Sequence, residues 1–124
     1  MWIEYNPNPC NRRVGDCVIR AIAKATDREW ESVYVDLCVQ GFMLADLPSS
    51  NAIWSVYLKN KGFKRHTIED CPDCYTIEDF CQEHPKGVYV IGTGTHAVAV
   101  MDGNIFDAWN SSHEIPQYYF EKEI

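Results

Sequence analysis

One cysteine stands where a nucleophile would have to stand. Cys17 follows Gly15 and Asp16 and opens the largely apolar run 18–25, which predicts a buried helix. Asp16 is suited to cap that helix, because its carboxylate can accept from the N–H groups of the first turn. The positive end of a helix dipole stabilises thiolate over thiol, so Cys17 is a candidate nucleophile. The simpler alternative is a small buried side chain, which is what most free cysteines are.

A histidine and an aspartate are predicted to meet across a hairpin. Asp102 and Gly103 form a strong two-residue turn signal between two alternating segments. With that turn, His96 and Asp107 become diagonal neighbours about 7–8 Å apart at the backbone, and Trp109 lies opposite His96. The same face would carry three apolar residues: Val98, Val100 and Ile105. A carboxylate beside an imidazole fixes its tautomer and stabilises the imidazolium. The alternatives are a pair that only satisfies itself, or a slipped register that separates the two.

The segments that must position these residues begin with helices. Residues 1–15 carry prolines at 7 and 9 and are expected to be an extended arm leading to the cysteine. Asp27 is expected to cap a second helix and Gly41 to end it, with an apolar stripe on one face. The stripe consists of Trp30, Val33, Tyr34, Leu37 and Cys38. A third helix is predicted over 51–61, and Thr76 to Asp79 resembles a capping box that starts a short fourth helix.

Strands follow the helices. Residues 63–68 alternate weakly and are a candidate short strand. From Gly87 the apolar period changes to two, which predicts strands over 87–92, 95–101 and 104–109, with another over 115–120. Helices first and an antiparallel sheet afterwards is an α+β arrangement. With 124 residues, the chain is expected to be one domain, 1–124.

The composition argues against several kinds of partner. The net charge of −7 disfavours unaided binding to nucleic acid or to anionic lipid. No apolar run reaches the length of a membrane span, and the N-terminus has neither the basic start nor the apolar core of a signal peptide. We therefore expect a cytoplasmic protein whose six cysteines are reduced thiols and which needs no cofactor.

Cys71 and Cys74 form a separate motif. Their C-x-x-C spacing supplies two zinc ligands, whereas a structural zinc site needs four. The remaining ligands would have to come from scattered residues: Cys10, His66, Cys81 and His84. The motif also lacks the βαβ context of a redox pair. We therefore expect two loop thiols and no metal site, and a small zinc-stabilised domain is the alternative.

The order Cys17, His96 and Asp107 along the chain resembles that of papain-like cysteine peptidases. The spacing of the last two across one tight hairpin is similar to compact members of that superfamily, the peptidase C39-like group. Four stretches also resemble small proteins from bacteriophage and gut-bacterial sequences: 6–25, 48–51, 71–75 and 94–109. The resemblance implies a compact papain-like fold in which N-terminal helices pack on a C-terminal antiparallel sheet.

The resemblance also implies roles for single residues. Cys17 would attack an acyl carbon, His96 would carry the proton, and Asp107 would orient His96. The family's oxyanion hole combines the backbone N–H of the nucleophile with a side-chain amide about six positions upstream, which points to Asn11 in place of the usual glutamine. Asn6 and Asn8 are the nearby substitutes, and turn formation beside prolines is the simpler role for all three asparagines.

The function implied by the resemblance is that of a thiol hydrolase. By analogy it would be a cysteine peptidase acting on a peptide or isopeptide bond of a protein or peptide, in a bacterial cell or a phage-infected host. Asp16 and Trp109 would support the site from neighbouring positions. The same groups could also run deamidation or acyl transfer. A binding or inhibitor module that keeps the fold without catalysis is the alternative from another class, and the thiol pKa of Cys17 separates the two.

Overall fold

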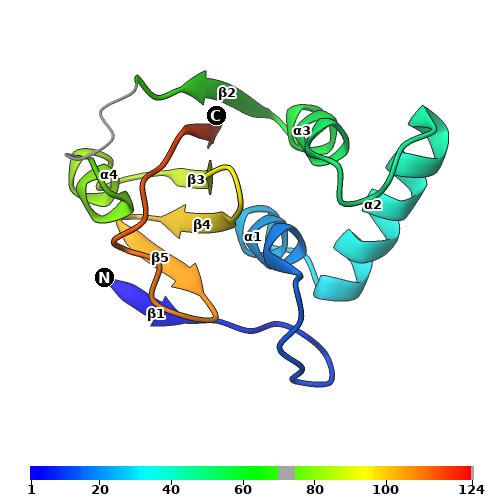
Figure 1. Ribbon diagram of the computed structural model, residues 1–124, viewed down its shortest axis with the longest axis horizontal. Coiled ribbons are helices and arrows are strands. Elements are labelled where there is room, and N and C mark those ends of the chain that lie inside the picture. The colour runs from blue at the N-terminus through cyan, green and yellow to red at the C-terminus, as the bar shows by residue number, and fades with distance from the viewer. Residues whose placement is uncertain (70–74, 124) are drawn as a thin grey trace.

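The structure is a computed structural model that describes residues 1–69 and 75–123. Within these residues a six-stranded sheet carries helices on both faces (Figure 1). The helices are α1 (Cys17–Thr26), α2 (Trp30–Leu44), α3 (Asn51–Asn60) and α4 (Ile77–Glu83). The strands are β1 (Trp2–Glu4), β2 (Phe63–Thr67), β3 (Val88–Gly92), β4 (Ala97–Met101), β5 (Asn104–Asp107) and β6 (Tyr118–Lys122). The predicted α+β class is confirmed.

The sheet is mixed rather than antiparallel. Its strand order is β1-β5-β4-β3-β6-β2, and β1 runs parallel to β5 while the other neighbouring pairs are antiparallel. The expectation of a purely C-terminal antiparallel sheet is therefore wrong. β1 comes from the N-terminal arm and has three residues, which is too short for a period-two pattern to show in the sequence. β2 comes from the middle of the chain and reaches the opposite edge by pairing with β6.

Helices cover both faces of the sheet. On one face, α1 lies against β4 and stands between β4 and α2, while α3 packs beside β2 and β6 (Figure 1). Ala21 and Ala25 of α1 share a buried cluster with Ala97 and Ala99 of β4, and these small side chains let the helix and the strand approach closely. On the other face, α4 buries Phe80 against β3 and β4. The start of α1 is thereby held beside the start of β4.

The boundary between α1 and α2 differs from the prediction. Asp27 does not cap α2. It ends α1 as the C-cap residue, with a left-handed backbone at φ 54°. The N-cap of α2 is Glu29, and the predicted apolar stripe is only partly inside, because Val33 and Leu37 are buried whereas Tyr34 is 48% exposed.

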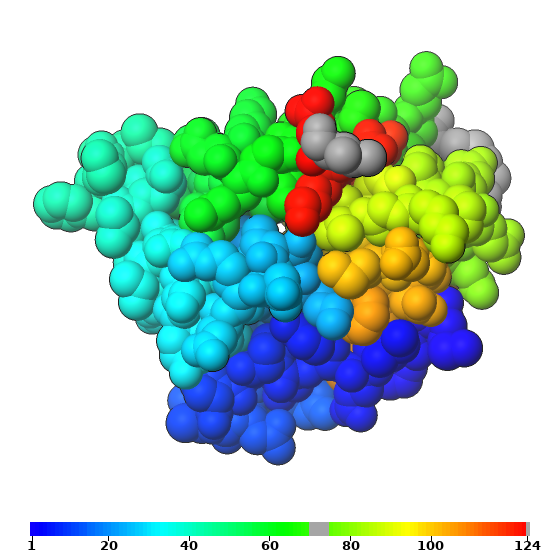
Figure 2. Space-filling model, turned by 180° about the vertical axis from the view of Figure 1, so that it is seen from behind, coloured from blue at the N-terminus to red at the C-terminus, as the bar shows by residue number. Residues whose placement is uncertain are grey.

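Gly41 does not end α2, which continues to Leu44. A Cβ on Gly41 would lie 2.7 Å from the carbonyl oxygen of Asp46, so glycine is needed because the following loop folds back onto the helix. The additional turn carries Phe42 and Met43, which are 87% and 74% exposed. This end of α2 projects from the body of the molecule (Figures 1 and 2).

Several local predictions are confirmed. Thr76 and Asp79 form a capping box at the start of α4, each side chain accepting from the backbone N–H of the other residue. Asp102 and Gly103 have φ of 50° and 78°, as a mirror-image two-residue hairpin turn requires. α3 and β2 occupy the predicted segments 51–61 and 63–68 to within one residue.

Three strands are shorter or shifted relative to the prediction. β4 begins at Ala97 rather than at 95, β5 ends at Asp107 rather than at 109, and β6 covers 118–122 rather than 115–120. Pro116 precedes β6 and has no backbone N–H to donate to a neighbouring strand. The shortening of β4 leaves His96 just outside the sheet, which matters for where its side chain can point.

Candidate functional site

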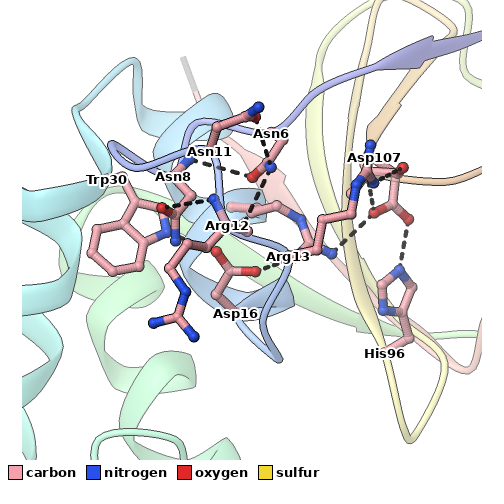
Figure 3. Close-up of polar contacts among 11 residues, drawn as sticks. Asn6, Asn8, Asn11, Arg12, Arg13, Asp16, Trp30, His96 and Asp107 are labelled. Atoms are coloured by element: carbon pink, nitrogen blue, oxygen red, sulfur yellow. Dashed lines mark hydrogen bonds and ion pairs between the residues drawn. The ribbon is translucent and has the colours of Figure 1, made fainter.

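Cys17, His96 and Asp107 lie at three element ends that meet. Cys17 is the first residue of α1, His96 directly precedes β4, and Asp107 is the last residue of β5. His96 Nε2 lies 2.6 Å from Asp107 Oδ2, which confirms the predicted contact (Figure 3). His96 also lies beside the Cys17 thiol, with which it lines two cavities, and it stabilises the thiolate. Because Asp107 occupies Nε2, the ring nitrogen left for the thiol is Nδ1. We call these residues the Cys17–His96–Asp107 cluster.

The hairpin has the predicted register. However, His96 and Asp107 do not come together because they point from the same face of the sheet. The ladder between β4 and β5 ends at the pair of Ala99 and Phe106. The apolar residues predicted to share the face pack with α4: Val98, Val100 and Ile105. Asp107 instead contacts Arg20 of α1, which packs on the opposite face. His96 and Asp107 lie beyond the last pair of the β4–β5 ladder, and Asp107, which pairs with Glu4 of β1, is the last residue of its strand. At such a strand end alternation no longer fixes the direction of a side chain.

His96 is enclosed on several sides. Its side chain is 9% exposed, and the centroid of its ring lies 4.6 Å from that of Trp109, which is itself half-exposed and covers the imidazole as predicted. Burial disfavours the imidazolium. The hydrogen bonds with Asp107 and Cys17 outweigh burial and raise the pKa of His96 to about 9. The imidazole is therefore mainly protonated at neutral pH.

Asp107 is the most firmly held member of the cluster. It is buried, and each carboxylate oxygen accepts two hydrogen bonds. Oδ1 accepts from Arg20 at 3.2 Å and from the N–H of Ala108 at 2.8 Å. Oδ2 accepts from His96 and from the hydroxyl of Ser111, the latter at 2.7 Å. Burial alone would raise the pKa of Asp107, but the bonds from His96 and Ser111 outweigh it and lower that pKa.

The Cys17 thiol has the opposite surroundings. It is half-buried, and burial opposes its ionisation. The pKa of Cys17 is nevertheless lowered, because His96, the backbone N–H of Ala97 and the charge on Arg20 stabilise the thiolate. The thiolate and the imidazolium are thus favoured together. Chemically, such a pair offers a nucleophile and a proton donor side by side.

Asp16 stands at the N-cap position of α1 but does not cap it, contrary to the prediction. Its side chain makes no hydrogen bond with an N–H of the first turn. One carboxylate oxygen pairs with the guanidinium of Arg20, and the other accepts from the indole N–H of Trp30 at 2.8 Å (Figure 3). Asp16 is therefore connected to Asp107 through Arg20.

Two cavities border Cys17 and His96. The larger has a volume of about 330 Å³ and is also lined by Asn6 and Trp109. The smaller has a volume of about 190 Å³ and extends to Tyr118 of β6. The thiol end of the cluster is thus open to a second molecule from two sides, whereas the carboxylate end is closed.

The N-terminal arm approaches the cluster through asparagines. Asn11 has a left-handed backbone at φ 53° and lines neither of these two cavities. Its side-chain oxygen accepts from Asn6 Nδ2 at 3.4 Å, and Asn6 Nδ2 also donates to the carbonyl of Arg12 at 3.2 Å (Figure 3). Asn8 Oδ1 accepts from the N–H groups of Cys10 and Arg12 and so builds the turn. Of the three asparagines, Asn6 is the one that lines a cavity together with Cys17.

Two residues of the site escaped the sequence analysis. Arg20 is a charged residue inside a helix that is otherwise apolar, four positions after Asp16, and this spacing places the two on one side of the helix. That signal was present in the sequence. Ser111 lies in an irregular segment after β5, and no periodic pattern there could have pointed to it.

Cys71 and Cys74, on which the zinc alternative depends, lie outside the described residues. Within 1–69 and 75–123, no group of three or more His, Cys, Asp or Glu side chains is arranged to hold a metal ion. Cys10 is exposed and Cys81 is buried.

Comparison of the chain with known protein families, with curated proteins and with solved structures gives no match. Among the helices of the described residues, none combines the length and the apolar character needed to cross a membrane. Any function must therefore be argued from the geometry of the Cys17–His96–Asp107 cluster.

Proposed function

We propose that the chain is a thiol hydrolase of papain-like type, acting as a cysteine peptidase on a peptide or isopeptide bond. The observation that carries the proposal is a thiol at the start of a helix, beside an imidazole that stabilises its thiolate and whose Nε2 lies 2.6 Å from a buried carboxylate. Nucleophile, base and orienting group then stand in the order that nucleophilic catalysis requires.

The reaction follows from the protonation states. The Cys17 thiolate attacks the carbonyl carbon, and the carbonyl electrons move onto oxygen to give a tetrahedral oxyanion. The oxyanion collapses, the C–N bond breaks, and the His96 imidazolium gives its proton to the leaving amine. A water molecule then attacks the thioester carbon while His96 takes a proton from that water. The C–S bond breaks, which releases the acid product and regenerates the Cys17 thiolate. Asp107 keeps the imidazole oriented and stabilises its charged form through both halves of the reaction.

The oxyanion would be held by backbone and side-chain N–H groups. The N–H of Cys17 is in the first turn of α1 and has no partner within the helix. For the second donor we assign Asn6 rather than Asn11, because Asn6 lines the cavity at the thiol and Asn11 does not. Asn6 would have to release one of its present acceptors, Asn11 or the carbonyl of Arg12, to donate to substrate.

Alkylation by iodoacetamide at pH 6.5, read by mass spectrometry of peptides, tests the proposal. A thiolate stabilised by His96 should react at least about tenfold faster than an ordinary thiol at this pH. Exposed Cys10 serves as the reference within the same molecule. We expect Cys17→Ala to lose the fast-reacting site, His96→Gln to slow it, and Cys10→Ala to leave it unchanged. Equal rates at Cys17 and Cys10, or no effect of His96→Gln, would overturn the proposal.

A binding module without catalysis is the second candidate, and the exposed end of α2 favours it. Phe42, Met43 and Leu47 are 87%, 74% and 69% exposed, and large exposed apolar side chains that gather at one place mark interaction surfaces. The alkylation experiment separates the two candidates. An unreactive Cys17 favours the binding module, whereas a fast Cys17 that forms an acyl-enzyme with a peptide thioester or ester favours the hydrolase.

A further inference from the structure

Three charged side chains are buried at the carboxylate end of the Cys17–His96–Asp107 cluster, Asp107 itself among them. Asp16, Arg20 and Asp107 are 6%, 6% and 1% exposed. Removing such groups from water is costly for each ion, and apolar replacements of similar volume are often as stable or more stable. Nε of Arg20 is also buried and has no hydrogen-bond partner among the described residues, which adds a further cost. Stability alone therefore does not account for a charged side chain at position 20.

The guanidinium of Arg20 bridges two carboxylates that belong to different elements. Nη1 pairs with Asp16, at the start of its own helix, and Nη2 lies 3.2 Å from Asp107 Oδ1, at the end of β5. The indole of Trp30 in α2 donates to the other oxygen of Asp16 at 2.8 Å. Because a guanidinium is planar, fixing one of its terminal nitrogens on Asp16 also fixes the direction of the other.

This clamp determines which oxygen of Asp107 faces His96. Arg20 and the N–H of Ala108 occupy Oδ1, so that Oδ2 is left for His96 and Ser111. Rotation of the carboxylate would break all four hydrogen bonds. The imidazole is held in turn with Nε2 on Asp107 and its other nitrogen toward Cys17.

We propose that Arg20 is a positioning residue, which orients Asp107 and through it His96, so that the imidazole meets the Cys17 thiol. The inference rests on the proposed function, and it assigns to Arg20 no contact with substrate. The two charged groups that face the guanidinium are both carboxylates, those of Asp16 and Asp107. Beyond Asp107 the path continues to the imidazolium of His96 and the thiolate of Cys17. Loss of the cation would leave two buried carboxylates without a shared partner and would weaken the hold on His96.

The test is the pH dependence of Cys17 alkylation by iodoacetamide, measured between pH 5 and pH 10. In Arg20→Gln we expect the rise in rate to move to higher pH, giving about tenfold slower alkylation at pH 6.5, the size that a shift of one pKa unit produces. A merely structural role would lower the fraction of folded protein without moving the profile. Circular dichroism and thermal unfolding report that fraction separately.

Arg20→Lys separates orientation from charge and also serves if Arg20→Gln does not fold. Lysine keeps the positive charge, but its single ammonium cannot make the planar bridge between Asp16 and Asp107. We expect its profile to shift in the same direction, with about threefold slower alkylation at pH 6.5. A lysine profile that coincides with that of the wild type would overturn the positioning role.

Arg13→Gln is the matched control, because Arg13 borders the same cavity but is exposed and bonds only outside the cluster, to Glu4 and the carbonyl of Ala108. Its profile should coincide with that of the wild type, and a shift equal to that of Arg20→Gln would overturn the inference. If wild-type Cys17 itself reacts like Cys10, the proposed function fails. If Cys17 is fast and the Arg20 variants leave the profile in place, only the positioning role fails.

Discussion

The two ends of the Cys17–His96–Asp107 cluster differ in how firmly the protein holds them. At the carboxylate end, Asp107 is 1% exposed and its two oxygens accept from a guanidinium, an imidazole, a hydroxyl and a backbone N–H. At the thiol end, Cys17 is half-buried and borders two cavities. One end is saturated with protein partners, whereas the other has room for a second molecule.

The difference indicates where orientation is set and where binding can occur. Groups that must keep one geometry need partners that lock their rotamers, and such partners are available only in the interior. A nucleophile must meet an incoming molecule and therefore has to stay accessible. His96 joins the two ends. One of its ring nitrogens is bonded to the buried carboxylate of Asp107, and the other is on the side of the accessible thiol. The comparison predicts that removing a group at the closed end costs more stability than removing the thiol at the open end.

The largest expected effect is that of Asp107→Ala on stability. Removal of the carboxylate leaves Arg20 and the protonated His96 without their shared partner in the interior, and breaking a buried pair in this way costs about 3–5 kcal/mol. Cys17→Ala, at the open end, should cost less than about 1 kcal/mol. Urea unfolding at pH 7 measures both free energies. If the two variants lost similar free energies of unfolding, the proposed difference between the closed end and the open end would be wrong.

Ser111→Ala removes one hydrogen bond from Asp107 and leaves the others in place. Ser111 is fully buried and its hydroxyl lies 2.7 Å from Oδ2. A hydrogen bond to a charged group contributes about 1.5–3 kcal/mol, so we expect a loss of free energy of unfolding in that range. Ser112→Ala, at the next and less buried position, should change it by less than about 0.5 kcal/mol. If the two variants lose equal stability, the closed end is less firmly held than its hydrogen bonds indicate.

Gly92→Ala tests whether the ring of Tyr118, which lines the smaller cavity at the open end, is held in place. A Cβ at Gly92 would lie 2.2 Å from Cζ of Tyr118, whose ring lines the smaller cavity at Cys17. The ring would have to move, and overpacking of this kind costs about 1–3 kcal/mol. Gly15→Ala is the control, because nothing lies within 4 Å of a Cβ there although Gly15 borders both cavities. Thermal unfolding that does not distinguish the two variants would show that the ring of Tyr118 adapts freely.

The parts of the site that the sequence predicted depend on local signals. The largely apolar run 18–25 and the cap signal at Asp16 placed the start of α1 at Cys17, and the Asp102-Gly103 turn fixed the register that makes His96 and Asp107 neighbours. Such signals are confined to a few consecutive residues, and the structure of a tight turn follows from them directly. The face on which the pair lies could not be predicted, because both residues lie beyond the last pair of the β4–β5 ladder.

The parts that the sequence did not predict depend on contacts between distant segments. The sequence assigned the carboxylate of Asp16 to helix capping, a local role, but Arg20 and Trp30 bind it instead. A buried arginine can bridge Asp16 and Asp107 only because α1 lies beside β5. Arg20 and Asp107 are 87 residues apart in the sequence. β1 was missed for the same reason, since a three-residue strand is defined by its partner and not by its own pattern.

The smallest expected effect is a shift in the pKa of His96 when the Cys17 thiol is removed. Asp107 and Cys17 both raise the pKa of His96, to about 9, against about 6.5 in an unfolded chain. Because the folded pKa is the higher one, the stability contributed by the imidazolium is fully present below pH 6.5 and is lost as the pH rises through about 9. In Cys17→Ala the pKa should fall but stay above 6.5, since Asp107 remains. NMR titration of the imidazole ring measures both values. A pKa that returns to about 6.5 in Cys17→Ala would mean that the thiolate, and not the buried carboxylate, holds the proton on His96.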